Sequence, residues 1–186
     1  MLGWNEEIKK ELKYCGENVF IGHNTLFANP KDVVLHDNVR IDPFCLIATR
    51  LEASSYVQIC SHVVLGGGSG QKIKLEDWTF VGYGSKLFCS SEDYSGDNGP
   101  VNDFWGNNKI FRGNIEFKQY SGVASDVIVF PGVSIPTGCT VGAKSLVHTN
   151  SKLKEWSVFI GSPVEFHKPR NKENIIKYSS DKDWIK

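Results

Sequence analysis

The sequence predicts an all-β solenoid built from short parallel strands. A large apolar residue returns every six positions, small or turn-forming residues fill the positions between, and the series runs through most of the 186 residues. A period of six fits neither an amphipathic helix nor a long flat strand. It fits short strands joined by tight turns, and three such hexads would close one triangular coil of about 18 residues. The hexads begin with Leu35, Ile41, Ile47, Ala53, Ile59, Leu65, Leu75, Val81, Leu87, Phe117, Val123, Val129, Ile135, Val141, Val147 and Leu153.

The two ends of the chain depart from the hexads. Residues 1–17 are expected to form a helical cap, because Ile8, Leu12 and Cys15 have helical spacing within NEEIKKELKYC at 5–15. A terminal repeat needs such a polar cover. The solenoid domain then covers residues 18–161.

A C-terminal tail with a short helix is predicted for residues 162–186. Tyr178 and Trp184 are expected to anchor this tail by burying their rings.

Two segments interrupt the hexads. GGGSGQKIK at 66–74 lacks the pattern of a phosphate-binding loop, so we expect an irregular corner. The segment 88–116 is too long for a corner, and loops of this length are usually functional or disordered. It contains Tyr94, Phe104, Trp105 and Phe111, and disordered segments have few aromatic residues. We therefore predict an ordered arm that packs on a neighbouring subunit.

The composition excludes several classes of partner and cofactor. Lys+Arg and Asp+Glu both number 21, so the chain has no overall field that would attract nucleic acid or an anionic membrane. No apolar run is long enough for a transmembrane helix, and the charged N-terminus lacks a signal-peptide core, which predicts a cytoplasmic protein. The five cysteines have no CxxC spacing, so neither a disulfide framework nor a metal site is expected.

The hexads resemble the left-handed parallel β-helix of the hexapeptide-repeat acetyltransferases. SSEDYSG at 90–96 is similar to an S-x-D-D-Y-S-G run of the bacterial sugar O-acetyltransferase branch, which includes galactoside and maltose acetyltransferases. GSPVEF at 161–166 is similar to the G-N-P-A-K-x segment that closes the coil in that family. The resemblance implies a left-handed coil, a homotrimer, and acetyl-CoA as co-substrate in a groove between two subunits.

The resemblance also implies which residues would hold acetyl-CoA. Small residues at matching positions would let the pantetheine arm approach the backbone, and basic residues of the tail would meet the phosphates. These candidates are Ser125, Gly142, Ala143, Thr149, Lys168 and Arg170. Two alternatives stay open, since the hexads require small residues in any case and a basic tail can simply be solvated.

The sequence offers several alternatives for the general base. In the resembled enzymes the catalytic histidine ends a hexad like L-Y-T-A-T-H, whereas the matching hexad here is LFCSSE and ends in Glu92. Either His62, which lies just before the Gly-rich segment, or a carboxylate takes this role, or the acceptor is an amine that needs little assistance. His62 and Glu92 are thus the candidate catalytic residues, and Asp93, Tyr94 and Trp105 are candidate contacts for the sugar.

Three functions follow as hypotheses. The first is an acetyl-CoA-dependent O-acetyltransferase that acts on a sugar hydroxyl, in the synthesis of a bacterial surface polysaccharide such as O-antigen or capsule. The second is an N-acetyltransferase that acts on a nucleotide-linked amino sugar, which the substitution by Glu92 favours. The third is a non-catalytic scaffold or a metal-dependent hydration enzyme. The irregular separations of His23, His36 and His62, 13 and 26 residues, argue against the metal site.

Overall fold

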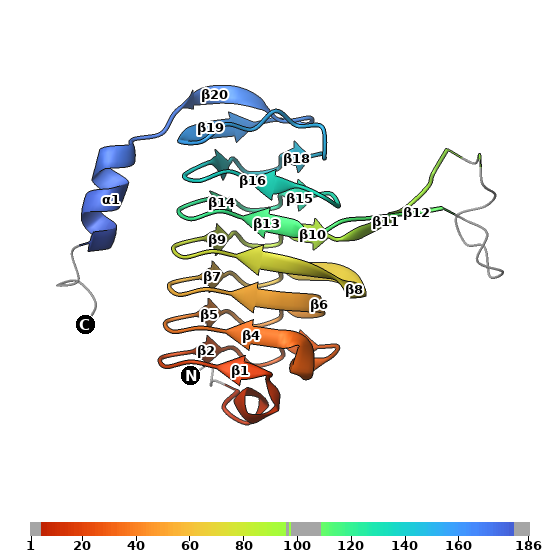
Figure 1. Cartoon of the computed structure of the whole chain (residues 1–186), viewed down its shortest axis with the longest axis vertical. Coiled ribbons are helices and arrows are strands. Elements are labelled where there is room, and N and C mark those ends of the chain that lie inside the picture. Colours follow the sequence, from red (N-terminus) through yellow and green to blue (C-terminus); the bar gives the residue numbers. More distant parts are fainter. Residues whose placement is uncertain (1–4, 96, 98–108, 181–186) are drawn as a thin grey trace.

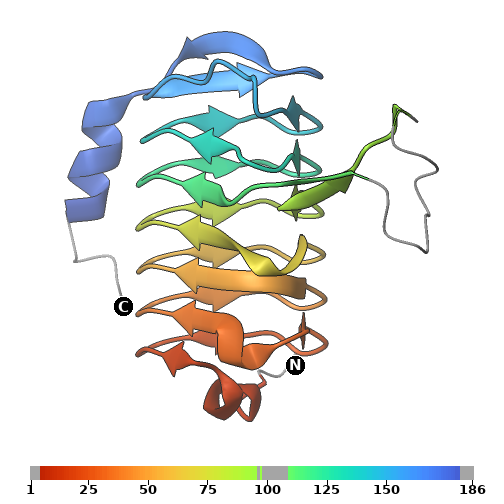
Figure 2. The ribbon, with the colours of Figure 1, turned by 45° about the vertical axis from the view of Figure 1, so that its right-hand side comes forward.

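The protein is a parallel-strand solenoid in which successive coils stack along one axis (Figures 1 and 2). This computed structural model describes residues 5–95, 97 and 109–180. The predicted all-β solenoid is confirmed, while the hand of the coil stays a prediction. Neighbouring coils pair through short parallel strands whose registers repeat from coil to coil, such as Ile41 opposite Ile59 and Ile59 opposite Val81.

Each coil has three faces. The first face consists of β2 (Phe20–Ile21), β5 (Arg40–Ile41), β7 (Gln58–Ile59), β9 (Phe80–Val81), β14 (Gly122–Val123), β17 (Thr140–Val141) and β19 (Ser157–Ile160). The second face consists of β3 (Leu26–Phe27), the starts of β6 (Leu46–Ala53) and β8 (Val64–Leu75), β10 (Lys86–Phe88), β15 (Ile128–Val129) and β18 (Leu146–Val147). The third face consists of β1 (Tyr14–Cys15), β4 (Val33–Leu35), the ends of β6 and β8, β13 (Ile115–Phe117) and β16 (Ser134–Ile135).

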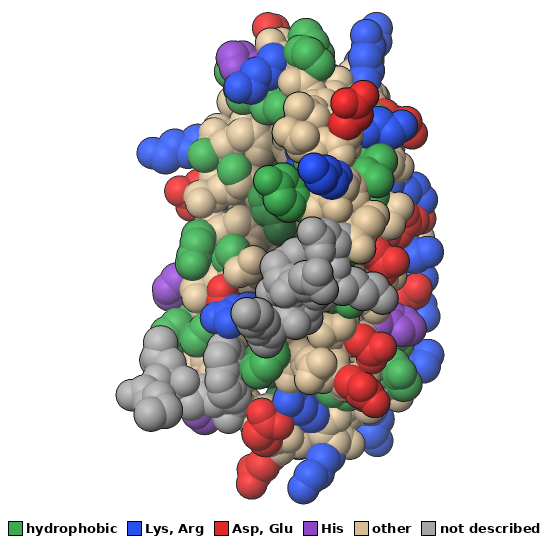
Figure 3. Space-filling view, turned by 90° about the vertical axis from the view of Figure 1, so that its left-hand side faces the viewer, with side chains coloured by type: hydrophobic (Ala, Val, Ile, Leu, Met, Phe, Trp, Pro, Cys, Tyr) green, Lys and Arg blue, Asp and Glu red, His purple; other side chains and the backbone are tan. Residues whose placement is uncertain are grey.

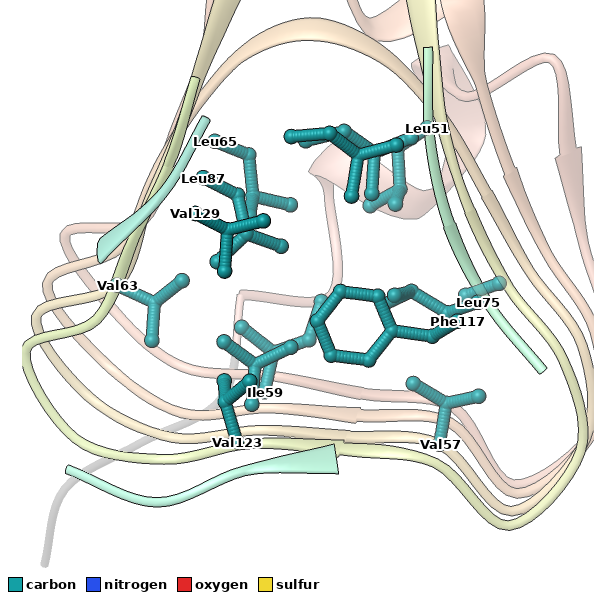
Figure 4. Packing of buried hydrophobic residues seen from close by; sticks show 14 of the residues in the cluster. Leu51, Val57, Ile59, Val63, Leu65, Leu75, Leu87, Phe117, Val123 and Val129 are labelled. Carbon is teal, nitrogen blue, oxygen red and sulfur yellow. The ribbon is translucent and has the colours of Figure 1, made fainter. Parts of the chain in front are cut away.

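The core is a set of apolar columns inside the triangle. Figure 4 shows Leu65, Leu87 and Val129 stacked from the second face, while Leu75 and Phe117 stack from the third. All of these side chains are fully buried. Because each buried aliphatic side chain contributes about 1.5–3 kcal/mol, stabilisation accumulates coil by coil. The first residue of each hexad therefore points inward, as the period of six predicts.

The corners use backbone conformations that favour Asn and Gly. The corner between the third and first faces has positive φ at Asn38, and also at Tyr56, Trp78 and Tyr120. Non-glycine residues rarely adopt this conformation. Here the rings stack along the axis, and the Tyr56 and Trp78 centroids lie 4.3 Å apart with an interplanar angle of 7°. Ring stacking thus offsets the strain of these corners.

The sequence predicted a helix over 5–15, but the helical segment is much shorter. Only one 3-10 turn forms, η1 (Ile8–Glu11), and β1 (Tyr14–Cys15) already belongs to the first coil. Tyr14 and Cys15 pair with β4, so backbone pairing with the next coil ends the helical segment. A second 3-10 turn, η2 (Pro30–Asp32), fills the corner before β4.

The Gly-rich segment 66–74 crosses the corner between the second and third faces with inserted residues, as predicted, but it does so within a strand. It lies within β8, a strand that continues from the second face to the third alongside β6. The extra residues form a bulge, because Thr49 faces Gly68 while the next residue, Arg50, faces Lys72. Gly67 has φ +138°, and a Cβ there would lie 2.5 Å from the Cβ of Cys89, so only glycine fits this position.

The arm begins as a two-stranded antiparallel ribbon that projects from the corner between the second and third faces (Figure 2). Its strands are β11 (Ser90–Glu92) and β12 (Ile110–Arg112), with Glu92 opposite Ile110. The arm was predicted to be ordered, and its base is an ordered ribbon. Phe104 and Trp105 lie outside the described residues.

The end of the chain closes the last coil. β20 (Glu165–Pro169) pairs antiparallel with β19, and α1 (Lys172–Ser180) then runs down the outside of the solenoid (Figure 1). The helix contacts the aromatic corner through a hydrogen bond of 3.0 Å between the hydroxyls of Tyr120 and Ser179. The prediction that Tyr178 anchors the tail by burial is wrong, since that side chain is 66% exposed. Trp184 lies outside the described residues.

Among the described residues no helix is long and apolar enough to cross a membrane.

We expect Cys15 to be the only thiol that reacts readily with a disulfide reagent in the native protein at pH 8. Cys45, Cys60, Cys89 and Cys139 are buried. Burial raises the pKa of all five thiols, to about 11 for Cys45 and Cys89 and to about 12 for Cys139, but only Cys15 is partly exposed and open to the reagent. Thiol titration with and without guanidinium chloride checks this, and rapid native modification of a second cysteine would contradict it.

Candidate functional site

Two clefts meet where the arm leaves the solenoid. The arm cleft has a volume of about 310 Å³ and is lined by Ser91, Glu92, Tyr94, Phe111, Phe130, Pro131, His148 and Thr149. The upper cleft has a volume of about 540 Å³ and is lined by residues 148–152 together with Pro163 and Val164. His148 and Thr149 line both clefts, so the two clefts adjoin at these residues beside the last coils.

The arm wall of the cleft presents a carboxylate and an aromatic ring. Glu92 is the last residue of β11 and is partly buried. Asp93 follows it but is only 9% exposed, and its carboxylate accepts a hydrogen bond of 3.0 Å from the backbone N–H of Ser95. Asp93 thereby shapes the turn that presents Tyr94, which is 72% exposed.

The coil wall of the cleft is a pair of stacked rings. Phe130 follows β15 and His148 follows β18, and their ring centroids lie 4.8 Å apart with an interplanar angle of 23°. The backbone N–H of His148 donates a 3.0 Å hydrogen bond to Oγ of Ser151. The hydroxyl of Thr149 donates a 2.6 Å bond to the carbonyl of Pro131. This wall is therefore fixed before any ligand binds.

Sequence reasoning missed His148, because a histidine at the second position of a hexad looks like any other solvated residue of the repeat. A usable signal was its separation of 18 residues from Phe130, the length of one coil, which places the two rings on neighbouring coils. The position of His62 just before the Gly-rich segment directed attention to that histidine instead.

His62 lies at a different corner, between the first and second faces. It has φ +63°, is exposed, and stacks on Phe44 with ring centroids 5.3 Å apart. It does not line the arm cleft. Within one chain, the structure thus does not bring His62 and Glu92 together, and the role of His62 stays a prediction.

The residues predicted to hold acetyl-CoA divide between two edges of the second face. Ser125 and Ala143 directly precede the positive-φ corner residues Asp126 and Lys144, at the same corner as His62. Gly142 is packed so closely that a Cβ would lie 2.7 Å from Cγ2 of Ile160. Coil packing therefore already requires a small residue at this position. Thr149 lies at the opposite edge, in the arm cleft.

The two basic candidates in the tail have different surroundings. Lys168 is exposed on β20. Arg170 is partly buried, and its guanidinium donates hydrogen bonds to the carbonyls of Tyr120 and Gly138, the latter 3.0 Å long. Arg170 thus ties the tail to the aromatic corner. Contact of either residue with a CoA phosphate stays a prediction.

The outer surface of the second face is apolar. The side chains of Leu26 and Leu46 point outward and are 64% and 38% exposed. They continue upward through Val64, Ile128 and Leu146, with Lys86 as the one charged residue in this column. We call these five apolar side chains the apolar stripe.

The outer surface of the third face is charged. Figure 3 shows acidic and basic side chains gathered along the edge that this face forms. Nζ of Lys72 lies 2.8 Å from Glu52, and Nζ of Lys118 lies 2.8 Å from Glu116. These hydrogen bonds lower the pKa of both carboxyl groups. This charged, solvated face contrasts with the apolar stripe on the neighbouring second face.

Among the described residues, no cluster of His, Cys, Asp or Glu could hold a metal ion.

No family model matches the sequence. The dTDP-4-amino-4,6-dideoxy-D-glucose acyltransferase of Escherichia coli is 26% identical over 179 residues, which cover 90% of each chain. AntD, an N-acyltransferase from Bacillus cereus solved with dTDP and 3-hydroxybutyryl-CoA, is 28% identical with a TM-score of 0.87. That match covers 97% of this chain and 96% of AntD.

A more distant neighbour shares the fold alone. It is a hexapeptide-repeat acetyltransferase of Vibrio cholerae, solved with acetyl-CoA, with a TM-score of 0.62 and 15% identity over 89% of this chain and 75% of that one. The expected resemblance is confirmed, because the coil of hexads and the full-length matches agree. This chain is similar over nearly its whole length to acyltransferases that use acyl-CoA.

Proposed function

We propose that this protein transfers an acyl group from acyl-CoA to the amino group of a nucleotide-linked amino sugar. The observation that carries the proposal is the match, over nearly the whole chain, to two acyltransferases whose names or complexes include dTDP sugars or dTDP. A maltose O-acetyltransferase of Clostridium difficile is only 12% identical. An amine acceptor is therefore favoured over the sugar hydroxyl that the arm motif suggested.

The chemistry of the arm cleft supports an amine. Carboxylates are weak general bases for a sugar hydroxyl, and Glu92 stands where the resembled O-acetyltransferases have histidine. The same carboxylate attracts a protonated amine and can hold it at the cleft. We assign this binding role to Glu92, while Tyr94 and Phe111 offer ring surface to the sugar or its base.

The proposal includes more than one acyl donor, and it extends to a biological role. Acetyl-CoA is the expected donor, but AntD was solved with 3-hydroxybutyryl-CoA, so we include short hydroxyacyl groups. Acylated amino sugars would suit a bacterial surface polysaccharide. That role, and a place in the cytoplasm, stay predictions.

We also propose that the working enzyme is an assembly of copies, a homotrimer by resemblance. The expected donor-side residues Ser125 and Ala143 lie at one edge of the second face, and Glu92 lies beyond the other. A second copy packed on the apolar stripe would bring its donor edge toward the arm cleft of the first. His62 lies on that donor edge and would approach the same seam.

The proposal predicts turnover with an amino sugar and none with its hydroxyl analogue. Purified protein is mixed with acetyl-CoA or 3-hydroxybutyryl-CoA and with dTDP-4-amino-4,6-dideoxyglucose, and CoA thiol release is followed with a disulfide reagent. dTDP-6-deoxyglucose, which has a hydroxyl in place of the amine, is the matched acceptor control. We expect release only with the amine, and mass spectrometry should locate the acyl group on nitrogen. Turnover with dTDP-6-deoxyglucose alone would restore the O-acetyltransferase hypothesis.

A further inference from the structure

We propose that His148 is the catalytic residue that accepts the proton from the attacking amine. This inference rests on the proposed function and adds the proton acceptor to it. His148 is exposed and lines both the arm cleft and the upper cleft. A group at this junction can face an acceptor in one cleft and a donor that arrives from the other.

The ring of His148 is held in place without being buried. Stacking on Phe130 fixes the plane of the imidazole, and the backbone hydrogen bond to Ser151 fixes the turn that carries it. One edge of the ring therefore stays available to a ligand. Such pre-organisation suits general-base catalysis, in which the base must lie within hydrogen-bond reach of the proton that it removes.

The charged and titratable groups around His148 have different roles. On the arm, Glu92 and Tyr94 face it across the arm cleft, and Lys152 lies on its other side in the upper cleft. Glu92 favours a positive charge in the cleft, first on the substrate ammonium and then on the imidazolium. Lys152 disfavours that positive charge, but its own ammonium group can bind a phosphate of either substrate.

The proton balance of the step is complete. The bound ammonium first releases one proton to solvent water. The lone pair of the resulting neutral amine attacks the thioester carbonyl carbon, a C–N bond forms, and the carbonyl π electrons move to oxygen. His148 takes the surplus proton from nitrogen. The carbonyl then re-forms, the C–S bond breaks, and the CoA thiolate leaves with the electron pair of that bond. The imidazolium gives its proton to the thiolate, which restores neutral His148.

His148→Gln tests the proposal, with His36→Gln as the matched control, because His36 is also exposed but lines neither cleft. His62→Asn tests the alternative base, and Asn suits the positive φ at position 62, so all three variants should fold and keep the melting temperature of the native protein. We expect kcat for the amino sugar to fall by about 10²-fold or more in His148→Gln and to stay within about threefold in His36→Gln. KM for acyl-CoA should change little in either of these two variants.

A second pair of measurements separates catalysis from structure. The acidic limb of the kcat/KM profile, where the base becomes protonated, should disappear in His148→Gln. In His148→Ala, added imidazole should restore part of the rate, which a purely structural role would not allow. In the native protein, the imidazole NMR signals of His148 should shift on addition of the amino sugar without acyl-CoA.

The outcomes separate the two proposals. If the native protein acylates the amino sugar and His148→Gln does so equally well, the role of His148 is refuted while the proposed function stands. A loss of activity in His62→Asn but not in His148→Gln would give the role to His62. If the native protein acylates no amino sugar, the proposed function itself fails, and the role of His148 falls with it.

Discussion

Phe117→Ala is expected to lower the free energy of unfolding by about 3–5 kcal/mol. Phe117 is fully buried in β13, where the chain re-enters the coil after the arm. It pairs with Leu75 below and Ile135 above, so its ring links the coils on either side of the insertion (Figure 4). Truncation leaves a cavity that rigid neighbouring strands cannot fill. Guanidinium chloride melts of both proteins, at one protein concentration, measure the loss.

Phe111→Ala is the matched control for Phe117→Ala. Phe111 is an aromatic residue of the same insertion, but its side chain is 48% exposed on β12. Its removal should change stability by less than about 0.5 kcal/mol, as is usual for exposed positions. It lines the arm cleft, so activity should fall instead. Equal stability of Phe117→Ala and native protein would show that the coils on either side of the arm do not depend on this ring.

The fold could be predicted from the sequence because the hexad is a local rule. Each of Leu65, Leu87 and Val129 begins a hexad, and the structure places all three in one buried column. The rule failed where a strand crosses a corner. Nothing in the period reveals that β6 and β8 continue side by side, since that depends on pairing between coils and on a bulge at Thr49.

The site was only partly predictable, because it depends on what the coil and the arm bring together. The unusual ending of the LFCSSE hexad identified Glu92, and the structure places Glu92 in a cleft. The sequence shows that His148 lies one coil beyond Phe130, but not that both rings face the arm across a cleft. His62 was selected instead because it precedes the Gly-rich segment, and it lies at the other corner of the second face.

A charge in the apolar stripe should separate the copies, and activity should be lost with the assembly. Leu46 is an outward residue of β6 and is 38% exposed in the single chain. If a second copy covers it, Leu46→Lys places an unpaired cation in an apolar interface, and such burial is unfavourable unless the charge is paired. We expect a monomer by sedimentation and less than about 1% of native turnover.

Gln58→Lys adds the same charge to an exposed outward position of β7 on the first face. It should leave both the assembly and the turnover unchanged, because no interface is proposed there. Circular dichroism should show native strand content in both variants, since neither residue points into the core. If Leu46→Lys sediments as the native protein does and keeps its activity, the stripe is not the seam. The donor edge that carries Ala143 would then have to reach Glu92 by packing on another face.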